Sequence, residues 1–301
     1  MDRLLEELSS SEIVFEFNHL VIVNDGSTTP TPISLLKKLE IQDFSVTLVE
    51  LNRNMGHQFA LASGLKTLLD VGWAGLVVTM DSDGEDSPFE IQQMCEANRL
   101  NPEALILAKR GHRKDSRIFK LSYRMYRAIF RILTGKTIDF GNFMLIPNQH
   151  LKHIVYRDEF WNHLSASVLK SECDKIKIRI NRRSRFNGSS KMNFISLVNH
   201  ALASMAVFAE TIFIRMFYFT FLLLTLVLLT FGLIIFLKLN SAQFVPGWTS
   251  SILGILAILA VQAVGILSST IFLSILFKRN IHSPTHSISP QYIARILQFS
   301  E

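Results

Sequence analysis

The sequence predicts an α/β sheet domain with mainly parallel strands, followed by a hairpin of two membrane-spanning helices. Short apolar runs alternate with segments of helical spacing in the first half of the chain, which is the pattern of a parallel sheet. Two long uncharged runs occupy the last third. The length of 301 residues accommodates one domain of ordinary size and such an appendage.

Four apolar runs are the candidate strands, at residues 20–23, 45–51, 75–80 and 104–108. The polar clusters that follow them read NDGSTTPTP, NRNMGH, DSDGEDSP and KRGHRKDS. A segment of helical spacing, 59–69, follows the second cluster. Ligands of such sheets bind at the carboxyl ends of the strands, so these clusters predict a binding site at one sheet edge.

The two long apolar runs are the candidate membrane spans, at 216–237 and 251–277. Each is long enough to cross about 30 Å of hydrocarbon as a helix. The alternative, two buried helices of a soluble core, is disfavoured by their lengths. Arg215 precedes the first span and Lys278 follows the second, so the positive-inside rule places both ends in the cytoplasm.

Charge and cysteine content exclude several classes of protein. The net charge of +6 favours contact with anionic lipid over nucleic acid as a partner. Cys95 and Cys173 lack paired spacing, which argues against a disulfide framework or a zinc site. The first ten residues lack the basic start and apolar core of a signal peptide.

Carboxylates cluster directly after the third candidate strand, where Asp81, Asp83, Glu85 and Asp86 lie within six residues. Carboxylates crowded at the end of a buried strand repel one another unless a cation joins them. Mg²⁺ or Mn²⁺ takes such oxygen ligands and bridges phosphates. The alternative is a solvated turn in which Pro88 begins a helix.

Three motifs occur in order: V-N-D-G-S at 23–27, R-N-x-G-H at 53–57 and M-D-S-D-G-E-D-S-P at 80–88. Together they resemble the motifs of the family 2 inverting glycosyltransferases of the GT-A fold, a Rossmann-like sheet domain. The branch that loads a sugar onto a polyprenyl phosphate is the most similar, as in dolichyl-phosphate mannose synthase and bacterial lipid-carrier glucosyltransferases. The resemblance implies a UDP- or GDP-sugar donor, a polyprenyl phosphate acceptor of the undecaprenyl or dolichyl type, and Mg²⁺ or Mn²⁺.

The resemblance also implies roles for the donor-side residues. Asp25 would contact the nucleobase or ribose, with Arg53 and Asn54 near the nucleotide. Asp81 would lie near the nucleoside and Asp83 on the metal. Glu85 stands where the family often has a glutamine ligand. A further segment, RFNGSSKMNF, resembles the family's R-x-x-G-x-S-K element, so the implied ligands of the donor diphosphate are Arg185, Ser190 and Lys191.

On the acceptor side, KRGHRKDS at 109–116 resembles the family's basic phosphate-binding loop, which makes Arg110 and Arg113 the candidates. A solvated charge run is the alternative. FGNFMLIP at 140–147 matches the G-D-F-x-L element, with Asn142 in place of the aspartate. No carboxylate base would then stand there, which favours an acceptor that is already anionic over a hydroxyl.

Two stripes at helical spacing point to the membrane surface independently of the family. Between 117 and 133 a basic face adjoins an apolar one, as in helices that lie on anionic membranes, although an ordinary solvated face has the same composition. A second apolar stripe runs from 195 to 212. We expect an interfacial helix at 192–215 between a catalytic domain at 1–191 and a span region at 216–277, with a cytoplasmic tail at 278–301.

The family's first apolar strand and its P-x-Y/F-N-E-type turn have no counterpart here, so we expect an unfilled strand position in the sheet. This absence supports one alternative to a polyprenyl-phosphate glycosyltransferase, a catalytically impaired membrane protein that binds nucleotide-sugar. A relative of the processive polysaccharide synthases, which resemble this domain, is another alternative. The Q/R-x-x-R-W motif of those synthases is not found in the sequence. We expect a multi-pass protein of the bacterial inner membrane that acts in cell-envelope glycan synthesis, and two spans per chain are compatible with a homo-oligomer.

Overall fold

The computed structural model describes residues 7, 18–29, 31, 33, 36, 45–110, 117–180, 183, 186, 194–240, 247–280 and 292–299. At 110, 117–122, 194, 277–280 and 299 it describes the backbone alone. The chain forms two compact units. The first comprises 1–130, 136–207 and 284–301, and the second comprises 131–135 and 208–283.

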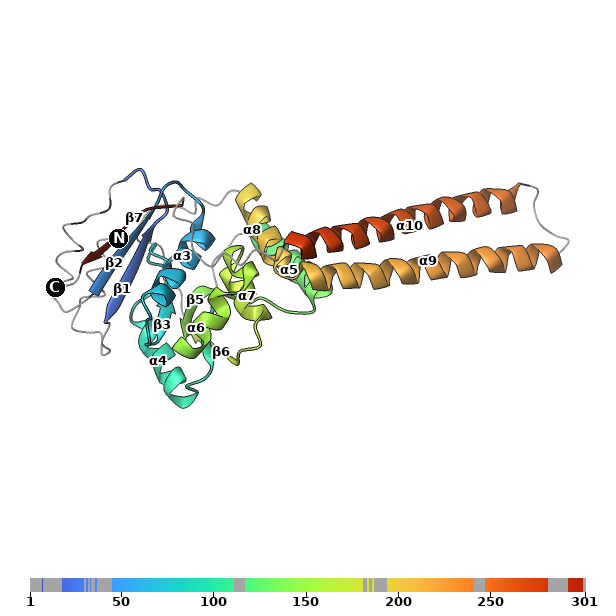
Figure 1. The fold of residues 1–301 in the computed structure, drawn as a ribbon. Helices are drawn as coiled ribbons and strands as arrows, with labels where there is room; N and C mark the ends of the chain where they lie inside the picture. Colours follow the sequence, from blue (N-terminus) through green and yellow to red (C-terminus); the bar gives the residue numbers. More distant parts are fainter. Residues whose placement is uncertain are drawn as a thin grey trace. The chain divides into compact units, whose positions relative to one another are not determined.

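The first unit contains two sheets (Figure 1). The three-stranded sheet has the order β1 (His19–Asn24), β2 (Ser45–Leu51), β7 (Ile293–Phe299). The four-stranded sheet has the order β3 (Val77–Thr79), β5 (Phe140–Ile146), β4 (Leu105–Arg110), β6 (Lys175–Ile180). All four predicted strands are therefore confirmed, with shifts of one or two residues at their ends.

The predicted parallel character is incomplete. β1 pairs with β2 and β4 pairs with β6 in parallel, but β5 runs antiparallel to both β3 and β4. The chain between β4 and β5 leaves and re-enters the sheet at the same edge, so β5 must run back. β7 is likewise antiparallel to β2.

The helices of this unit are α3 (His57–Asp70), α4 (Glu90–Leu100), α5 (Arg117–Thr134, which extends into the second unit), α6 (Asn148–Val155), α7 (Leu164–Lys170) and α8 (Phe194–Ala206), with a 3₁₀ turn, η1 (Asp158–Trp161). α3, α6 and α7 cover one face of the four-stranded sheet, where Leu107 and Met144 meet Leu65 and Leu151. α4 covers the other face. Burial on both faces explains the apolar runs LILA in β4 and FMLI in β5.

The described strands divide into two sheets. β1 and β3 stand at the ends of their sheets, and within the described ranges no strand pairs with the outer edge of either. The two sheets are joined by side chains instead, because Met80 packs against the apolar cores of both.

The segment after the second span, which gave no functional signal as sequence, returns to the first unit as β7. Arg295 of β7 forms an ion pair with Glu50 of β2. The Tyr292 carbonyl accepts from the Asn52 amide at 2.9 Å, and the Tyr292 ring contacts Phe59 of α3 with centroids 5.7 Å apart. The C-terminal strand thus borders the loop that follows β2.

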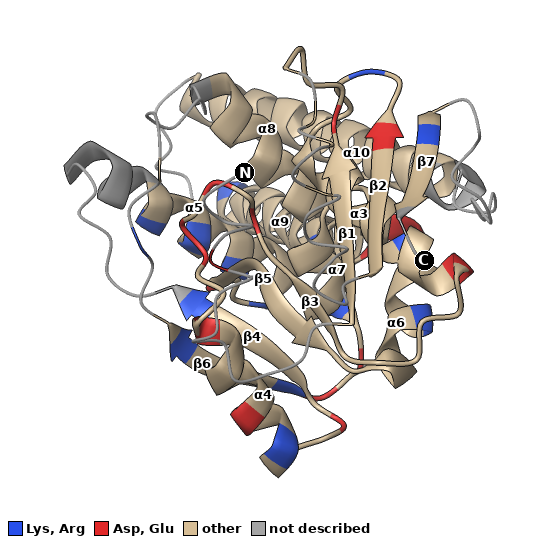
Figure 2. Ribbon diagram, turned by 90° about the vertical axis from the view of Figure 1, so that its left-hand side faces the viewer, with Lys and Arg blue, Asp and Glu red and all other residues tan. Residues whose placement is uncertain are grey.

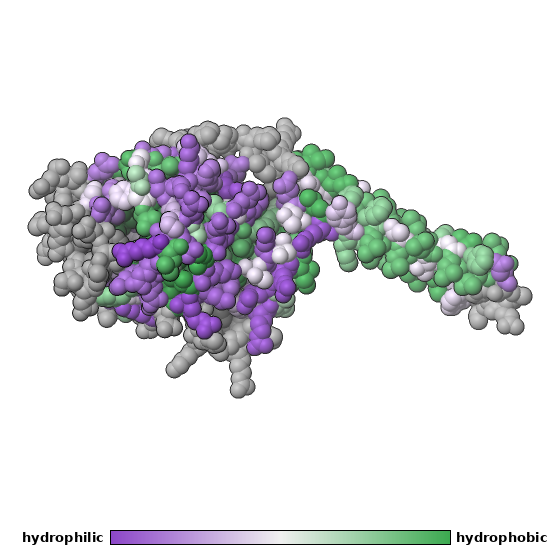
Figure 3. All heavy atoms as spheres, turned by 90° about the horizontal axis from the view of Figure 1, so that it is seen from below, coloured by the Kyte–Doolittle hydropathy of each residue, from purple (hydrophilic) through white to green (hydrophobic). Residues whose placement is uncertain are grey.

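The second unit contains α9 (Ala209–Asn240) and α10 (Trp248–Asn280), which lie side by side (Figure 1). Residues 209–240 and 248–276 are each long and apolar enough to cross a membrane. Figure 3 shows apolar side chains along both helices. The stripe predicted at 195–212 is divided, since α8 ends at Ala206 and α9 begins at Ala209.

Candidate active site

The loops after β1 and β2 are held together by one carboxylate. Asp25 Oδ1 accepts from the Met55 amide at 2.6 Å, and Asp25 Oδ2 accepts from the Gly56 amide at 2.8 Å. Gly26 has φ +61°, and a Cβ there would lie 2.4 Å from the Arg53 carbonyl carbon, so only glycine allows this approach. The predicted nucleotide ligand Asp25 therefore positions the R-N-x-G-H loop in this structure.

That loop presents two of the other predicted residues to solvent. Arg53 and Asn54 are both exposed. Arg53 Nε donates to Met55 Sδ at 3.2 Å, and Asn54 Oδ1 accepts from the Gly56 amide at 3.2 Å. These weak local contacts leave the guanidinium accessible to an anionic ligand.

The acidic loop after β3 is organised by its own carboxylates. Asp86 Oδ2 accepts from the Asp81 amide at 3.1 Å, and Asp83 Oδ1 accepts from the Glu85 amide at 3.0 Å. Glu85 and Asp86 are buried, whereas Asp81 and Asp83 are half-buried. Asp86 thus shapes the loop, and Asp81 and Asp83 are the carboxylates nearer to solvent.

Two residues absent from the sequence predictions lie directly on this loop. The amides of Arg183 and Phe186 donate to the carbonyls of Glu85 and Asp83, at 3.1 and 3.2 Å. Gly84 has φ +83°, and a Cβ there would lie 2.3 Å from the Phe186 ring. The Arg183 guanidinium lies 5.4 Å from the centroid of the Phe89 ring. Phe186 belongs to the RFNGSSKMNF segment, so that motif was the available signal.

Asn142 lies on β5, beside the acidic loop. It is 6% exposed, and its backbone carbonyl accepts from the Thr79 hydroxyl of β3. Its side-chain Oδ1 accepts from Gln58 Nε2 at 3.3 Å and from Ser165 Oγ at 2.9 Å. The sequence gave no role to Gln58 or Ser165, which are 84 and 23 residues away along the chain.

The basic loop is described only at its start. Arg110 ends β4 opposite Ile180 of β6, and its side chain is outside the described part. Lys109 and Lys177 bind the two carboxylate oxygens of Asp139 at 3.1 and 2.7 Å. Burial would raise the pKa of Asp139, but the hydrogen bonds and charges of the two lysines outweigh it and hold that pKa below its usual value. The ammonium group of Lys109 is therefore already paired with a carboxylate of the protein. Figure 2 shows basic residues on β6 and α5.

Four predicted residues lie outside the described ranges: Arg113, Arg185, Ser190 and Lys191. The hydrogen bonds of Arg183 and Phe186 bring the beginning of the RFNGSSKMNF segment to the acidic loop.

Comparison with known sequences identifies this set of motifs. The profile described as Glycosyl transferase family 2 matches residues 3–164, more than half of the chain. The chain belongs to glycosyl transferase family 2. It is a glycosyltransferase, and the resemblance stated from the motifs is confirmed.

Relatives within the family include lipid-phosphate enzymes. An uncharacterized glycosyltransferase of Synechocystis is 24% identical over 270 residues, which cover 88% of this chain and 81% of the relative. Another, of Bacillus subtilis, is 26% identical and covers 83% and 76%. The undecaprenyl-phosphate 4-deoxy-4-formamido-L-arabinose transferase of Proteus mirabilis is 25% identical over 206 residues, which cover 66% of this chain and 59% of that enzyme. The chain thus spans under two thirds of the relative whose acceptor is named.

The family's use of metal can be tested against the acidic loop. Among the described residues, no group of three or more His, Cys, Asp or Glu side chains is placed to hold a metal ion. Mg²⁺ is usually held by one or two carboxylates together with substrate phosphates and water. Asp83 is half-buried and its Oδ1 accepts from the Glu85 backbone amide, so Asp83 is a carboxylate of that loop within reach of such an ion, whereas Glu85 is 5% exposed.

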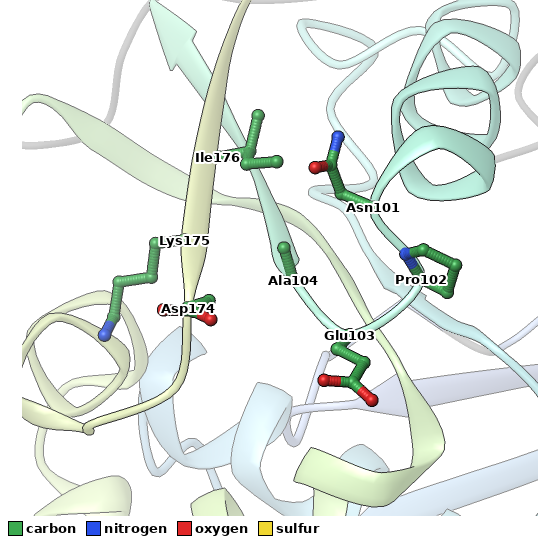
Figure 4. Close-up of a pocket in the computed structure, with 7 residues that line it drawn as sticks. All are labelled: Asn101, Pro102, Glu103, Ala104, Asp174, Lys175 and Ile176. Atoms are coloured by element: carbon green, nitrogen blue, oxygen red, sulfur yellow. The ribbon is translucent and has the colours of Figure 1, made fainter.

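A shallow hollow elsewhere does not belong to this site (Figure 4). It is lined by Asn101, Pro102, Glu103, Ala104, Asp174, Lys175 and Ile176. These residues precede or begin β4 and β6, at the end of the strands opposite to the motif-bearing loops. Ligands of open α/β sheets bind at the carboxyl ends of the strands, so we assign the function to the loops there.

Proposed function

We propose that this glycosyltransferase moves a sugar from a UDP- or GDP-sugar to a polyprenyl phosphate, with inversion at the anomeric carbon. The observation that carries the proposal is that carboxylates order both of the motif-bearing loops. Asp25 fixes the loop that bears Arg53, and the acidic loop bears Asp81 and Asp83. The printed names of relatives such as the Proteus mirabilis enzyme support the acceptor.

The reaction requires little proton transfer. An oxygen of the acceptor phosphate attacks the anomeric carbon, and the bond from that carbon to the nucleoside diphosphate breaks. A phosphate monoester is largely ionised near pH 7, because its second pKa is about 6. Catalysis then depends on orientation and on stabilising the charge of the leaving diphosphate.

We assign roles accordingly. Asp81 and Arg53 hold the nucleotide, with Asn54 beside them. Asp83 and Glu85 hold Mg²⁺ or Mn²⁺, which when bound neutralises charge on the diphosphate. Arg185, Ser190 and Lys191 bind the donor diphosphate, and the acceptor phosphate is bound by Arg110 and Arg113. Arginine suits this because its planar fork matches phosphate oxygens.

Two helices of the first unit support docking onto a membrane surface. Exposed apolar side chains occur on α5 at Tyr123, Met125 and Ile129, between arginines. α8 exposes Ile195, Val198 and Leu202. The hydroxyls of Tyr126 on α5 and Ser204 on α8 are 2.8 Å apart, which ties the two helices together. Apolar residues among basic ones suit an anionic bilayer, where a polyprenyl phosphate keeps its phosphate at the surface.

The pairing of β7 with β2 supports a hairpin topology. β2 precedes both apolar helices and β7 follows them, yet the strands share a sheet. The chain between them must therefore cross a membrane an even number of times. Two crossings by α9 and α10, flanked in the sequence by Arg215 and Lys278, support a cytoplasmic location of the first unit by the positive-inside rule.

The test is sugar transfer by the full chain in membranes, with labelled UDP- and GDP-sugars and added polyprenyl phosphate or polyprenol. We expect labelled lipid with polyprenyl phosphate, none with polyprenol, and loss of product when a chelator removes divalent metal. Product from polyprenol alone would contradict the assigned acceptor. Binding of a nucleotide-sugar without any transfer would favour a catalytically impaired binding protein.

A further inference from the structure

The side-chain oxygen of Asn142 is fully used inside the fold. Oδ1 accepts from both Gln58 Nε2 and Ser165 Oγ, and an amide oxygen has two lone pairs. The three residues are 6%, 9% and 1% exposed, so water does not compete freely for these bonds. The only polar group that Asn142 can offer a ligand is therefore its NH₂, which donates and cannot accept.

The orientation of this amide follows from a backbone group. The Leu164 amide can only donate, and it lies 2.7 Å from Gln58 Oε1. Gln58 Nε2 must then face Asn142, and Asn142 must accept this hydrogen bond through its side-chain oxygen. The order of donors thus runs from the Leu164 amide through Gln58 to Asn142, and it removes the usual ambiguity between the two ends of an amide.

Asn142 stands beside the acidic loop. The last pair of the β3–β5 ladder is Thr79 with Met144, and the Thr79 hydroxyl reaches the carbonyl of Asn142, two residues further on. Beyond Thr79 the chain leads through Met80 to Asp81. Asn142 is thus a neutral donor next to carboxylates, which suits a phosphate oxygen that the carboxylates would otherwise repel.

The geometry points to Gln58 and Ser165 as positioning residues that fix Asn142 as a hydrogen-bond donor to the acceptor phosphate. This assignment rests on the proposed function. It adds that Gln58 and Ser165, through Asn142, make the site select an anionic acceptor. A hydroxyl acceptor would need a base at this place, and an amide whose oxygen is already bonded cannot serve as one. The network thereby favours isoprenyl phosphates over isoprenols.

Binding measurements on the full chain in detergent test this without turnover, with citronellyl phosphate and citronellol as probes. Gln58 Nε2 lies 2.8 Å from His57 Nε2 and 3.3 Å from Asn142 Oδ1. Gln58→Glu puts an oxygen there, which would face the oxygen of Asn142 unless Asn142 turns its NH₂ inward and its oxygen toward the ligand. We expect the affinity for citronellyl phosphate to fall about tenfold, as for a lost hydrogen bond to a charged group. Affinity for the nucleotide-sugar should change less than about twofold, within the scatter of such measurements.

Ser165→Ala should weaken phosphate binding less, and Ser165→Thr should restore it because the hydroxyl returns. The matched control is Ser171→Ala, a buried serine near the end of α7 whose hydroxyl donates to the Val168 carbonyl outside the network. Equal losses in Ser165→Ala and Ser171→Ala, or no preference of the unchanged chain for citronellyl phosphate over citronellol, would overturn the assignment. If phosphate binding depended on Gln58 and Ser165 but the chain transferred no sugar, the proposed function would be rejected and the role of the two residues would stand.

Discussion

The two sheets of the first unit carry the two halves of the site, and they are built differently. The strands β4 and β5 of the four-stranded sheet are buried between helices on both faces. In the three-stranded sheet the central strand β2 is buried at Val46, Leu48 and Val49, but β1 has one buried residue, Ile22, and β7 is largely exposed. The acidic loop and Asn142 therefore stand on a sheet with two well-packed strands, whereas Asp25 follows a lightly packed edge strand.

This difference shows how a residue on a lightly packed edge strand can still fix a neighbouring loop. On the four-stranded sheet, packing fixes the strand ends, and the loop needs only its own carboxylates. On the three-stranded sheet, Asp25 binds two backbone amides of the next loop directly. Hydrogen bonds to the charged Asp25 side chain thus hold this loop in place, as apolar packing holds the strand ends of the four-stranded sheet.

The largest expected difference in stability comes from truncating one apolar side chain in each sheet. Leu107 is 0% exposed on β4, so Leu107→Ala should cost about 2–5 kcal/mol through lost burial and a cavity. Leu297 on β7 is only half-buried, so Leu297→Ala should cost roughly 1 kcal/mol or less. The melting temperatures of the two full-length variants in detergent check this. A larger drop in melting temperature for Leu297→Ala than for Leu107→Ala would contradict the view that β4 contributes more apolar burial to stability than β7.

Removing the carboxylate of Asp25 tests the second half of the comparison. Asp25→Ala takes the acceptor from the Met55 and Gly56 amides and should release the loop that bears Arg53. Hydrogen bonds to a charged group contribute about 1.5–3 kcal/mol, so affinity for the nucleotide-sugar should fall at least about tenfold. The readout is nucleotide-sugar binding, with Asp70→Ala at the end of α3 as the control. Unchanged binding would show that the loop is held by other contacts.

A smaller effect should appear as a pH dependence of stability. The pKa of Asp139 in the folded protein lies below its ordinary value because Lys177 and Lys109 outweigh the effect of burial. Its contribution to stability is thus present above the unfolded pKa of about 3.9 and is lost as pH falls further, through the folded pKa. Asp139→Asn should melt below the unchanged chain at pH 7, and the difference should shrink below about pH 4. A difference that stays constant down to pH 3 would contradict this.

Sequence reasoning recovered the strands and helices whose signals are local. The apolar runs of β1 to β4 and the helical spacing of α3 and α5 were sufficient for their elements. β6 was missed, although the alternation in KIKIRI from 175 to 180 was a usable signal. β7 was not foreseeable, because its partner residue Glu50 lies 245 positions from Arg295 and nothing local indicates the pairing.

The site divides in the same way. The motifs predicted Asp25, the acidic loop and Asn142 as site residues of a single sheet, but Asp25 follows β1 of the three-stranded sheet, while the acidic loop and Asn142 belong to the four-stranded one. They could not show that Asp25 binds the next loop, or that Gln58 and Ser165 occupy the oxygen of Asn142. Such contacts depend on how separate elements pack, and residue types at a given spacing do not determine them.

The most direct test of the account is the rate of sugar transfer to polyprenyl phosphate by Asp83→Ala. The matched control is Ser82→Ala, which changes an exposed residue of the same loop. We predict that Asp83→Ala lowers the rate about a hundredfold or more, as expected when charge stabilisation of a leaving group is lost, while Ser82→Ala and both melting temperatures stay close to those of the unchanged chain. If the Asp83→Ala rate stayed within about twofold of that of the unchanged chain, the loss would be far smaller than expected for such a group. That result would contradict the assignment of the acidic loop to catalysis.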